Sequence, residues 1–162
     1  MKQFGWILGV LIGCAAITAQ AGEPGVRVVE VKTGKPLPSG IQVIQVRMTP
    51  TETATYARLL FICRLHQKFP YKGSDGKEVE RTLEPADFTH REDAVSLTAD
   101  LDYHASFRVP LREDDLVKAY GKRTFRSGYP VTVSRVRIEA RDESGKVVWS
   151  VDAPMDQVTR LP

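Results

Sequence analysis

The stretch VSLTADLDYHASFRVPL, residues 95–111, alternates between apolar and polar side chains along its whole length. One parity holds Val95, Leu97, Ala99, Leu101, Tyr103, Ala105, Phe107, Val109 and Leu111. The other holds Ser96, Thr98, Asp100, Asp102, His104, Ser106 and Arg108. A hydrophobic period of two residues is typical of strands with one buried and one solvated face. The stretch therefore predicts β-structure with a covered inner side.

The same stretch is too long for one straight strand. Fully extended it would reach roughly 56 Å at about 3.3 Å per residue, whereas a compact domain of this size is roughly 37 Å across. We expect a break near residues 99–102, with Asp100-Leu101-Asp102 as a three-residue loop of a hairpin, because an odd loop preserves the parity and Asp tolerates turns. A long bent strand that passes from one sheet to another is the alternative.

The rest of the chain reads as short strands separated by turn residues. Strands are predicted at 26–31, 41–48, 56–66, 131–140 and 147–151, with a hairpin and then a long loop in 69–93 and a short helix over 112–121. A parity change between Val43 and Ile44 indicates a bulge. About eight strands with one short helix predict an antiparallel β-sandwich of immunoglobulin-like or prealbumin-like type.

The segment VKTGKPLPSGIQV, residues 31–43, resembles the opening of carboxypeptidase regulatory-like, prealbumin-type modules. In those modules a strand, a T-G-K-P-L turn and a second strand recur. The resemblance implies a sandwich and carries no function with it.

The first residues predict export. A single Lys, an apolar run from Phe4 to Ile17 and small residues at Ala19 and Ala21 describe a signal peptide over 1–21. One β-sandwich domain, 22–162, would then be periplasmic or secreted, with no membrane span once the signal is removed. LIGC, residues 11–14, resembles a lipoprotein lipobox, and that resemblance would make Cys14 the lipid-bearing residue of a membrane-anchored protein.

Charge and cysteine content narrow the classes of function. The chain has 23 Lys and Arg against 20 Asp and Glu, a balance that does not predict nucleic-acid binding. Cys63 lies in the apolar segment LLFICRL and is predicted to be a buried, unreactive thiol. The sequence has none of the common nucleotide-binding, serine-hydrolase or zinc-protease motifs, and no cofactor is predicted.

Metal and acid–base chemistry have weak signals. Asp100, Asp102 and His104 share one parity, but three ligands on one strand do not easily converge on an ion. We therefore predict that this row is a solvated outer face. We also predict ordinary solvated surface for FTHRED, with His90, Glu92 and Asp93 as an acid–base group in the alternative. His66 closes a strand as a capped or partly buried histidine.

The strongest predicted binding segment is KAYGKRTFRSGYP, residues 118–130, in which cations alternate with aromatic residues. Its predicted contacts to an anionic ligand are Lys118, Lys122, Arg123, Phe125, Arg126 and Tyr129.

Together these features predict an exported, bacterial-type, non-catalytic binding or assembly module of the cell envelope, whose partner is an envelope protein or an anionic envelope polymer. The alternatives are a small hydrolase or metal-dependent enzyme that uses His90, His104 and nearby acids, and a lipid-anchored structural or chaperone protein.

Overall fold

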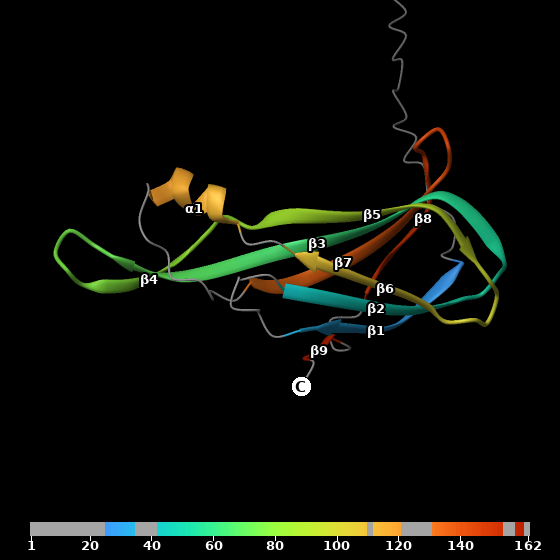
Figure 1. The fold of residues 1–162 in the computed structure, drawn as a ribbon, viewed down its shortest axis with the longest axis horizontal. Coiled ribbons are helices and arrows are strands. Elements are labelled where there is room, and N and C mark those ends of the chain that lie inside the picture. The colour runs from blue at the N-terminus through green and yellow to red at the C-terminus, as the bar shows by residue number, and fades with distance from the viewer. Residues whose placement is uncertain (1–24, 35–41, 110–111, 121–130, 154–157, 161–162) are drawn as a thin grey trace, which may run out of the picture.

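The computed structural model describes residues 25–34, 42–109, 112–120, 131–153 and 158–160. The strands are β1 (Val26–Thr33), β2 (Gln42–Pro50), β3 (Ala54–Lys72), β4 (Glu78–Thr82), β5 (Ala86–Leu97), β6 (Tyr103–Val109), β7 (Val131–Arg141), β8 (Val147–Asp152) and β9 (Val158–Arg160), with helix α1 (Glu113–Tyr120) before β7. They build two sheets (Figure 1). The predicted antiparallel β-sandwich with one short helix is confirmed, with a single departure in the described part of the chain: β9 pairs parallel to β1.

The two sheets enclose one apolar core. One sheet has four strands in the order β6-β2-β1-β9, and the other has five, in the order β4-β3-β7-β8 with β5 also paired to β3. Side chains from the inner sides of both sheets interdigitate, as expected for a sandwich. The largest of the fully buried apolar side chains in this core are Trp149, Phe61, Ile44, Met48, Leu59, Leu97 and Ile138.

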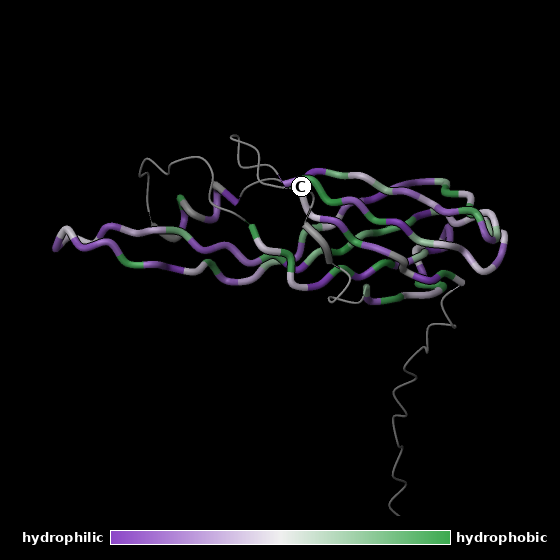
Figure 2. The backbone as a smooth tube through the Cα atoms, turned by 90° about the horizontal axis from the view of Figure 1, so that it is seen from below, coloured by the Kyte–Doolittle hydropathy of each residue, from purple (hydrophilic) through white to green (hydrophobic). Residues whose placement is uncertain are grey.

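Strand β3 extends beyond the body of the sandwich. Its ladder with β7 ends at Gln67, and residues 68–72 pair instead with β4 in a hairpin that we call the arm, residues 68–82. The arm projects from the body and is mostly hydrophilic (Figures 1 and 2). Every residue of β4 is exposed. The predicted hairpin in this region, with its tip at Gly73-Ser74-Asp75-Gly76, is confirmed.

The predicted break in the alternating stretch is confirmed, but the hairpin is wrong. A turn over residues 98–102 separates β5 from β6, and these two strands belong to different sheets. Two hydrogen bonds to the last residues of β2 hold the turn in place. Asp100 N–H donates to Pro50 O at 3.0 Å, and Thr49 Oγ1 donates to Asp102 Oδ1 at 2.6 Å. Asp100 has a positive φ of 59°, a conformation that Asp tolerates better than most residues.

The predicted long loop before residue 93 is also wrong, because β5 already begins at Ala86. The inner-facing residues of this strand change parity partway along. Glu92 points inward, and so does Val95 rather than Ala94, while the register with β3 is the same on both sides. Ala94, at a φ of 52°, absorbs the change. Because some inner positions are polar and the inner parity changes, the sequence of this strand shows no regular alternation of apolar residues.

The bulge predicted at Val43 and Ile44 is wrong as well. β2 keeps a regular burial pattern through these residues and pairs with β6 without a shift. The irregularity lies instead in β1, between Val28 and Glu30. Val43 is simply an apolar residue on the outer side of the sheet.

Candidate functional site

The open side of the sandwich, between edge strands β5 and β6, holds the acid–base residues that the sequence suggested. His90 and Glu92 point inward from β5, opposite Phe61 and Leu59 of β3. Tyr103 and Phe107 point inward from β6 in the other sheet. We call these four residues, His90, Glu92, Tyr103 and Phe107, the seam cluster.

Two polar contacts link three residues of the seam cluster. The Tyr103 hydroxyl donates to Glu92 Oε2, and Glu92 Oε1 lies 3.5 Å from His90 Nε2. Burial of the phenol, with the hydrogen bond to Glu92 as a further cause, raises the pKa of Tyr103 above its usual range. Tyr103 therefore stays protonated and serves as a donor, not as a general base.

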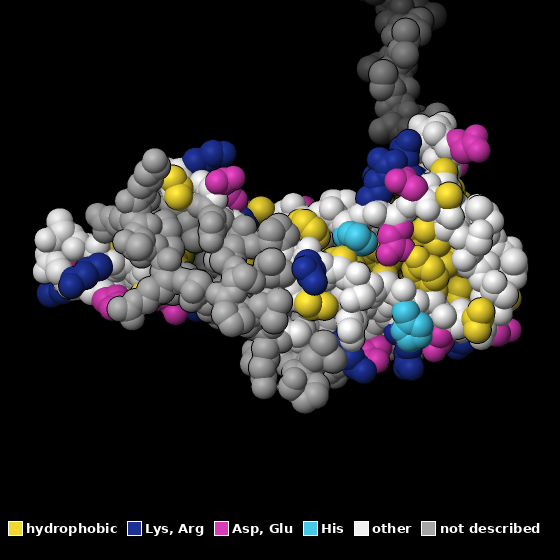
Figure 3. All heavy atoms as spheres, viewed as in Figure 1, with side chains coloured by type: hydrophobic (Ala, Val, Ile, Leu, Met, Phe, Trp, Pro, Cys, Tyr) yellow, Lys and Arg dark blue, Asp and Glu magenta, His cyan; other side chains and the backbone are white. Residues whose placement is uncertain are grey.

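Ring stacking completes the cluster. His90 lies parallel to Phe107, with centroids 4.6 Å apart and an interplanar angle of 10°. The ring of Phe61 also lies near His90, with centroids 6.1 Å apart and an interplanar angle of 35°. A space-filling view of this side of the molecule shows hydrophobic side chains at the surface, with a histidine beside an acidic side chain among them (Figure 3). These contacts join the two sheets and hold His90, Glu92 and Tyr103 at the joint between them.

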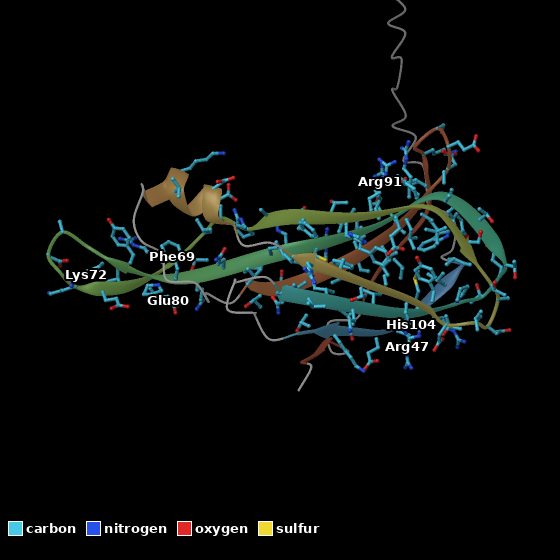
Figure 4. The ribbon with its side chains drawn as sticks, in the orientation of Figure 1. Arg47, Phe69, Lys72, Glu80, Arg91 and His104 are labelled. Carbon is cyan, nitrogen blue, oxygen red and sulfur yellow. The ribbon has the colours of Figure 1, made fainter. Side chains whose placement is uncertain are left out.

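The other candidate residues do not converge on this cluster. His104 lies on the outer side of β6, paired across the ladder with Arg47 (Figure 4). Asp102 accepts from Thr49 and lies 3.9 Å from Arg47, and Asp93 pairs with Arg91 on the outer side of β5. Among the described residues, no group of three His, Cys, Asp or Glu side chains is arranged to hold a metal ion.

Two further candidate residues from the sequence, His66 and Cys63, lie on β3. His66 Nε2 lies 2.7 Å from Ser134 Oγ on the neighbouring strand. Cys63 is fully buried, and burial raises the pKa of its thiol to about 12, with Asp87 as a smaller cause. The prediction of a buried, unreactive thiol at Cys63 is confirmed in its burial.

The predicted binding segment lies mostly outside the described residues. Lys118 is exposed in the last turn of α1. Lys122, Arg123, Phe125, Arg126 and Tyr129 fall outside the described part of the chain, as do the predicted signal peptide and Cys14.

The outer side of the five-stranded sheet carries a surface that the sequence analysis did not single out. Arginines from three neighbouring strands project from it: Arg58 and Arg64 on β3, Arg135, Arg137 and Arg141 on β7, and Arg91 on β5. We call this surface the arginine face. Arg91, on the β5 side, is labelled in Figure 4. The half-buried side chains of Leu60 and Ile62 lie between the arginines of β3.

Carboxylates on the arginine face are fewer than its guanidinium groups. Asp152 forms ion pairs with two arginines: its Oδ1 lies 3.0 Å from Arg137 Nε and 3.8 Å from Arg135 Nε. Arg64 pairs with Asp87 at 3.1 Å, Arg91 with Asp93 at 2.6 Å and Arg141 with Glu139 at 2.7 Å. Arg58 has no carboxylate partner among the described residues, because Asp93, opposite it in the ladder, is paired with Arg91.

Two rows of the arginine face put like charges directly opposite each other. Arg58 is the ladder partner of Arg141, and Arg64 is the ladder partner of Arg135. Directly opposed like charges destabilise a pair of strands. The sequence carried a signal for this surface, since Arg58, Arg64, Arg135 and Arg137 interrupt the apolar residues of two predicted strands. The register that sets them opposite each other was not visible.

Comparisons with known proteins leave the family open. No protein-family model matches the chain, and no curated protein matches it. The ligand-binding region of serine-glutamate repeat protein A of Enterococcus faecium is 12% identical, with a TM-score of 0.40 over 85% of this chain and 97% of that chain. The alkylpurine DNA glycosylase AlkC of Pseudomonas fluorescens is 15% identical, with a TM-score of 0.29 over 84% of this chain and 31% of that one. Likenesses this distant imply no function here.

Helix α1, within the described residues, is too short to cross a membrane, and no other described helix could do so.

Proposed function

We propose that the protein is an exported, non-catalytic binding or assembly module of the bacterial cell envelope, and that the arginine face binds an anionic ligand. The observation that carries the proposal is the direct opposition of Arg58 to Arg141 and of Arg64 to Arg135 across β3 and β7. A bound anion between such neighbours removes their mutual repulsion and gains charge-assisted hydrogen bonds.

The side-chain types suit phosphate or carboxylate groups on an extended surface. Guanidinium is planar and donates in a fixed fork, which matches both anions in a bidentate way. Alternate residues of a strand are about 6.6 Å apart, so the face repeats its donors at regular spacing. Leu60 and Ile62 add apolar contact area between them. An anionic envelope lipid or polymer fits this pattern, and an acidic envelope protein is the second partner class.

A non-catalytic role is supported by the seam cluster. Glu92 accepts from Tyr103, and His90 is stacked on Phe107. Both acid–base side chains are thereby used to join the sheets, and His104 lies on the outer side of the other sheet.

Binding to anionic surfaces tests the arginine face. We expect the purified protein to co-sediment with phosphatidylglycerol vesicles and with lipopolysaccharide but not with phosphatidylcholine vesicles, and to lose affinity as salt is raised. Arg58→Gln and Arg64→Gln should each weaken binding by about 1 kcal/mol, or about fivefold. Arg108→Gln is the matched control, because Arg108 is exposed on β6 in the other sheet. Equal loss in all three variants, or no anionic binding by the unmodified protein, contradicts the proposal.

The segment 118–130 is proposed as a second anion-binding element. Charge reversal of Lys122, Arg123 and Arg126 together should weaken binding to the same vesicles. Unchanged binding in this triple variant, alongside a loss in Arg58→Gln, assigns the ligand to the arginine face alone.

Export is tested at the N-terminus. Mass spectrometry of the protein from the envelope of a bacterial host should give a chain that begins at Gly22. A chain that begins with a lipid-modified Cys14 supports the membrane-anchored alternative, and an intact Met1 contradicts export.

A further inference from the structure

The edge of the four-stranded sheet at β6 is open to pairing with a further strand. Natural sheets protect their edges with short strands, irregular pairing or charged side chains that point inward. β5 carries the inward-facing Glu92 and the irregular Ala94, β4 and β9 are short, and the ladder of β8 shifts between Ala140 and Arg141 of β7. β6 instead has seven residues, pairs with β2 without a shift and carries no charged side chain on its inner side.

The hydrogen-bonding phase of β2 shows which backbone groups of β6 are turned outward. Val43 O accepts from Gly34 N–H at 2.8 Å, and Thr51 N–H donates to Gly25 O at 2.7 Å, so the odd-numbered residues of β2 bond toward β1. The direction of bonding alternates along an antiparallel strand, so the even-numbered residues of β2 bond to their odd-numbered partners in β6. The alternate residues of β6 direct their backbone N–H and C=O groups away from β2, and these are His104, Ser106 and Arg108.

The outer side of this free edge is basic. The side chains of His104 and Arg108 are exposed there, and Arg47 of β2 lies beside His104 (Figure 4). Arg108 has no carboxylate partner among the described residues, and its neighbour across the ladder is the apolar Val43. Carboxylates on an added strand would therefore find unneutralised cations opposite them.

The inner side of the same edge is apolar and incompletely covered. Phe107 of β6 is buried, whereas Tyr103 of β6 and Phe88 of β5 pack against the core but are only partly buried. Hydrophobic side chains reach the surface on this side of the molecule (Figure 3). An aromatic residue facing a β-branched residue is a favourable cross-strand pair. An added strand would therefore gain most from β-branched residues on its inner side.

We propose that β6 binds an extended segment of another protein in which acidic and β-branched residues alternate, and adds it antiparallel to the four-stranded sheet. The acidic residues lie opposite His104 and Arg108, and the β-branched residues between them face the seam cluster. Backbone hydrogen bonds at the outward-directed residues supply affinity, and the alternating side chains supply specificity. A second copy of β6 fits less well, because pairing centred on Ser106 sets Arg108 opposite His104 of that copy, with no carboxylate between them.

A synthetic peptide, acetyl-Val-Glu-Val-Thr-Val-Glu-Val-amide, is the probe for this edge. Its central Thr is placed opposite Ser106, and its two Glu residues are placed opposite His104 and Arg108. We expect isothermal titration calorimetry with the full chain to show saturable binding in the micromolar range. The same peptide with Lys in place of both Glu residues should bind at least about tenfold more weakly. The absence of saturable binding, or equal binding of both peptides, overturns the proposal.

A charge exchange at Arg108 tests the position of the peptide. Arg108→Glu should weaken binding of the Glu peptide by at least about tenfold, and should bind the Lys peptide more tightly than the unmodified protein does. Arg27→Glu is the matched control, because Arg27 is an exposed cation of the same sheet on β1, beyond β2 from the free edge. An equal loss in both variants contradicts binding at β6.

A change in the peptide backbone keeps the test independent of how the variants fold. N-methylation of the central Thr of the peptide removes the N–H that is directed at Ser106 and leaves the protein unmodified. The methylated peptide should bind at least about tenfold more weakly. Binding at full strength overturns strand addition. None of these results bears on the arginine face, whose binding to vesicles is measured separately.

Discussion

Tyr103 on β6 donates its hydroxyl hydrogen bond to Glu92 on β5, and this bond joins the two sheets on their open side. Glu92 is only 25% exposed, so water would poorly replace the Tyr103 hydroxyl as a partner of its carboxylate if that hydroxyl were removed. Tyr103→Phe keeps the ring and removes the donor, so it should lower the free energy of unfolding by about 1–2 kcal/mol, measured by urea denaturation. Combining it with Glu92→Gln in a double-mutant cycle should give losses that do not add, whereas additive losses would mean that the two groups do not interact.

Ala94 holds a positive φ of 52° in the middle of β5. A residue with a β-carbon is strained there, whereas glycine is not. Ala94→Gly should therefore raise the unfolding free energy by up to about 1 kcal/mol. Ala57→Gly, on the neighbouring strand β3, is the control, and it should lower the unfolding free energy by about 0.5–1 kcal/mol. Destabilisation of the same size in both variants would argue against strain at Ala94.

Asp152 makes part of the stability depend on pH. Its hydrogen bond from Arg137, with charge attraction to Arg137 and Arg135, holds the pKa of its carboxyl below the ordinary value of 3.8. The folded protein therefore favours the ionised carboxyl of Asp152. The stabilisation that it contributes is present above the pKa of the unfolded chain and is lost as the pH falls through the lowered pKa of the folded protein. Since the side chain is 49% exposed, screening limits the contribution to about 0.5 kcal/mol.

Unfolding in urea across a pH series measures this contribution. The difference in unfolding free energy between the unmodified protein and Asp152→Asn should shrink as the pH is lowered from 7 toward 2. A difference that stays constant over that range contradicts the linkage.

Cys63 should be chemically silent in the folded protein. Its thiol is buried and its pKa is raised to about 12, so the reactive thiolate is scarce at neutral pH. In a Cys14→Ala chain, which retains a single thiol, we expect a disulfide reagent to label Cys63 slowly without denaturant and rapidly in urea. Equal labelling rates in both conditions would show that the segment around Cys63 opens freely.

The sandwich was predictable from sequence because its strands keep a simple rhythm. Phe107, Val109 and Ile138 are buried as their parity predicts. β5 escaped detection for a physical reason: His90 and Glu92 take inner positions that an apolar residue would normally hold, and their cost is offset by Tyr103 and Phe107 on a strand of the other sheet. Because these partners lie on a different strand, the hydrophobicity pattern of the segment itself does not reveal them.

The candidate sites divide in the same way. The sequence predicted solvated surface for His90, Glu92 and Asp93, with an acid–base group as the alternative. The pleat of β5 instead turns His90 and Glu92 inward, where they are half-buried, and sends Asp93 to the opposite side. The arginine face depends on ladder partners such as Arg64 and Arg135, which are far apart in the chain. Spacing within one segment cannot reveal that register.

One uninterrupted strand serves both the arm and the body, since β3 pairs with β4 at its far end and with β5 and β7 on its two sides in the body. A pulling force applied at the arm tip would load the ladders on both flanks of β3 in shear, so that many backbone bonds share the tension. An edge strand under the same force would peel away bond by bond. A force on the projecting hairpin is thus transmitted to a strand that has a partner strand on each side.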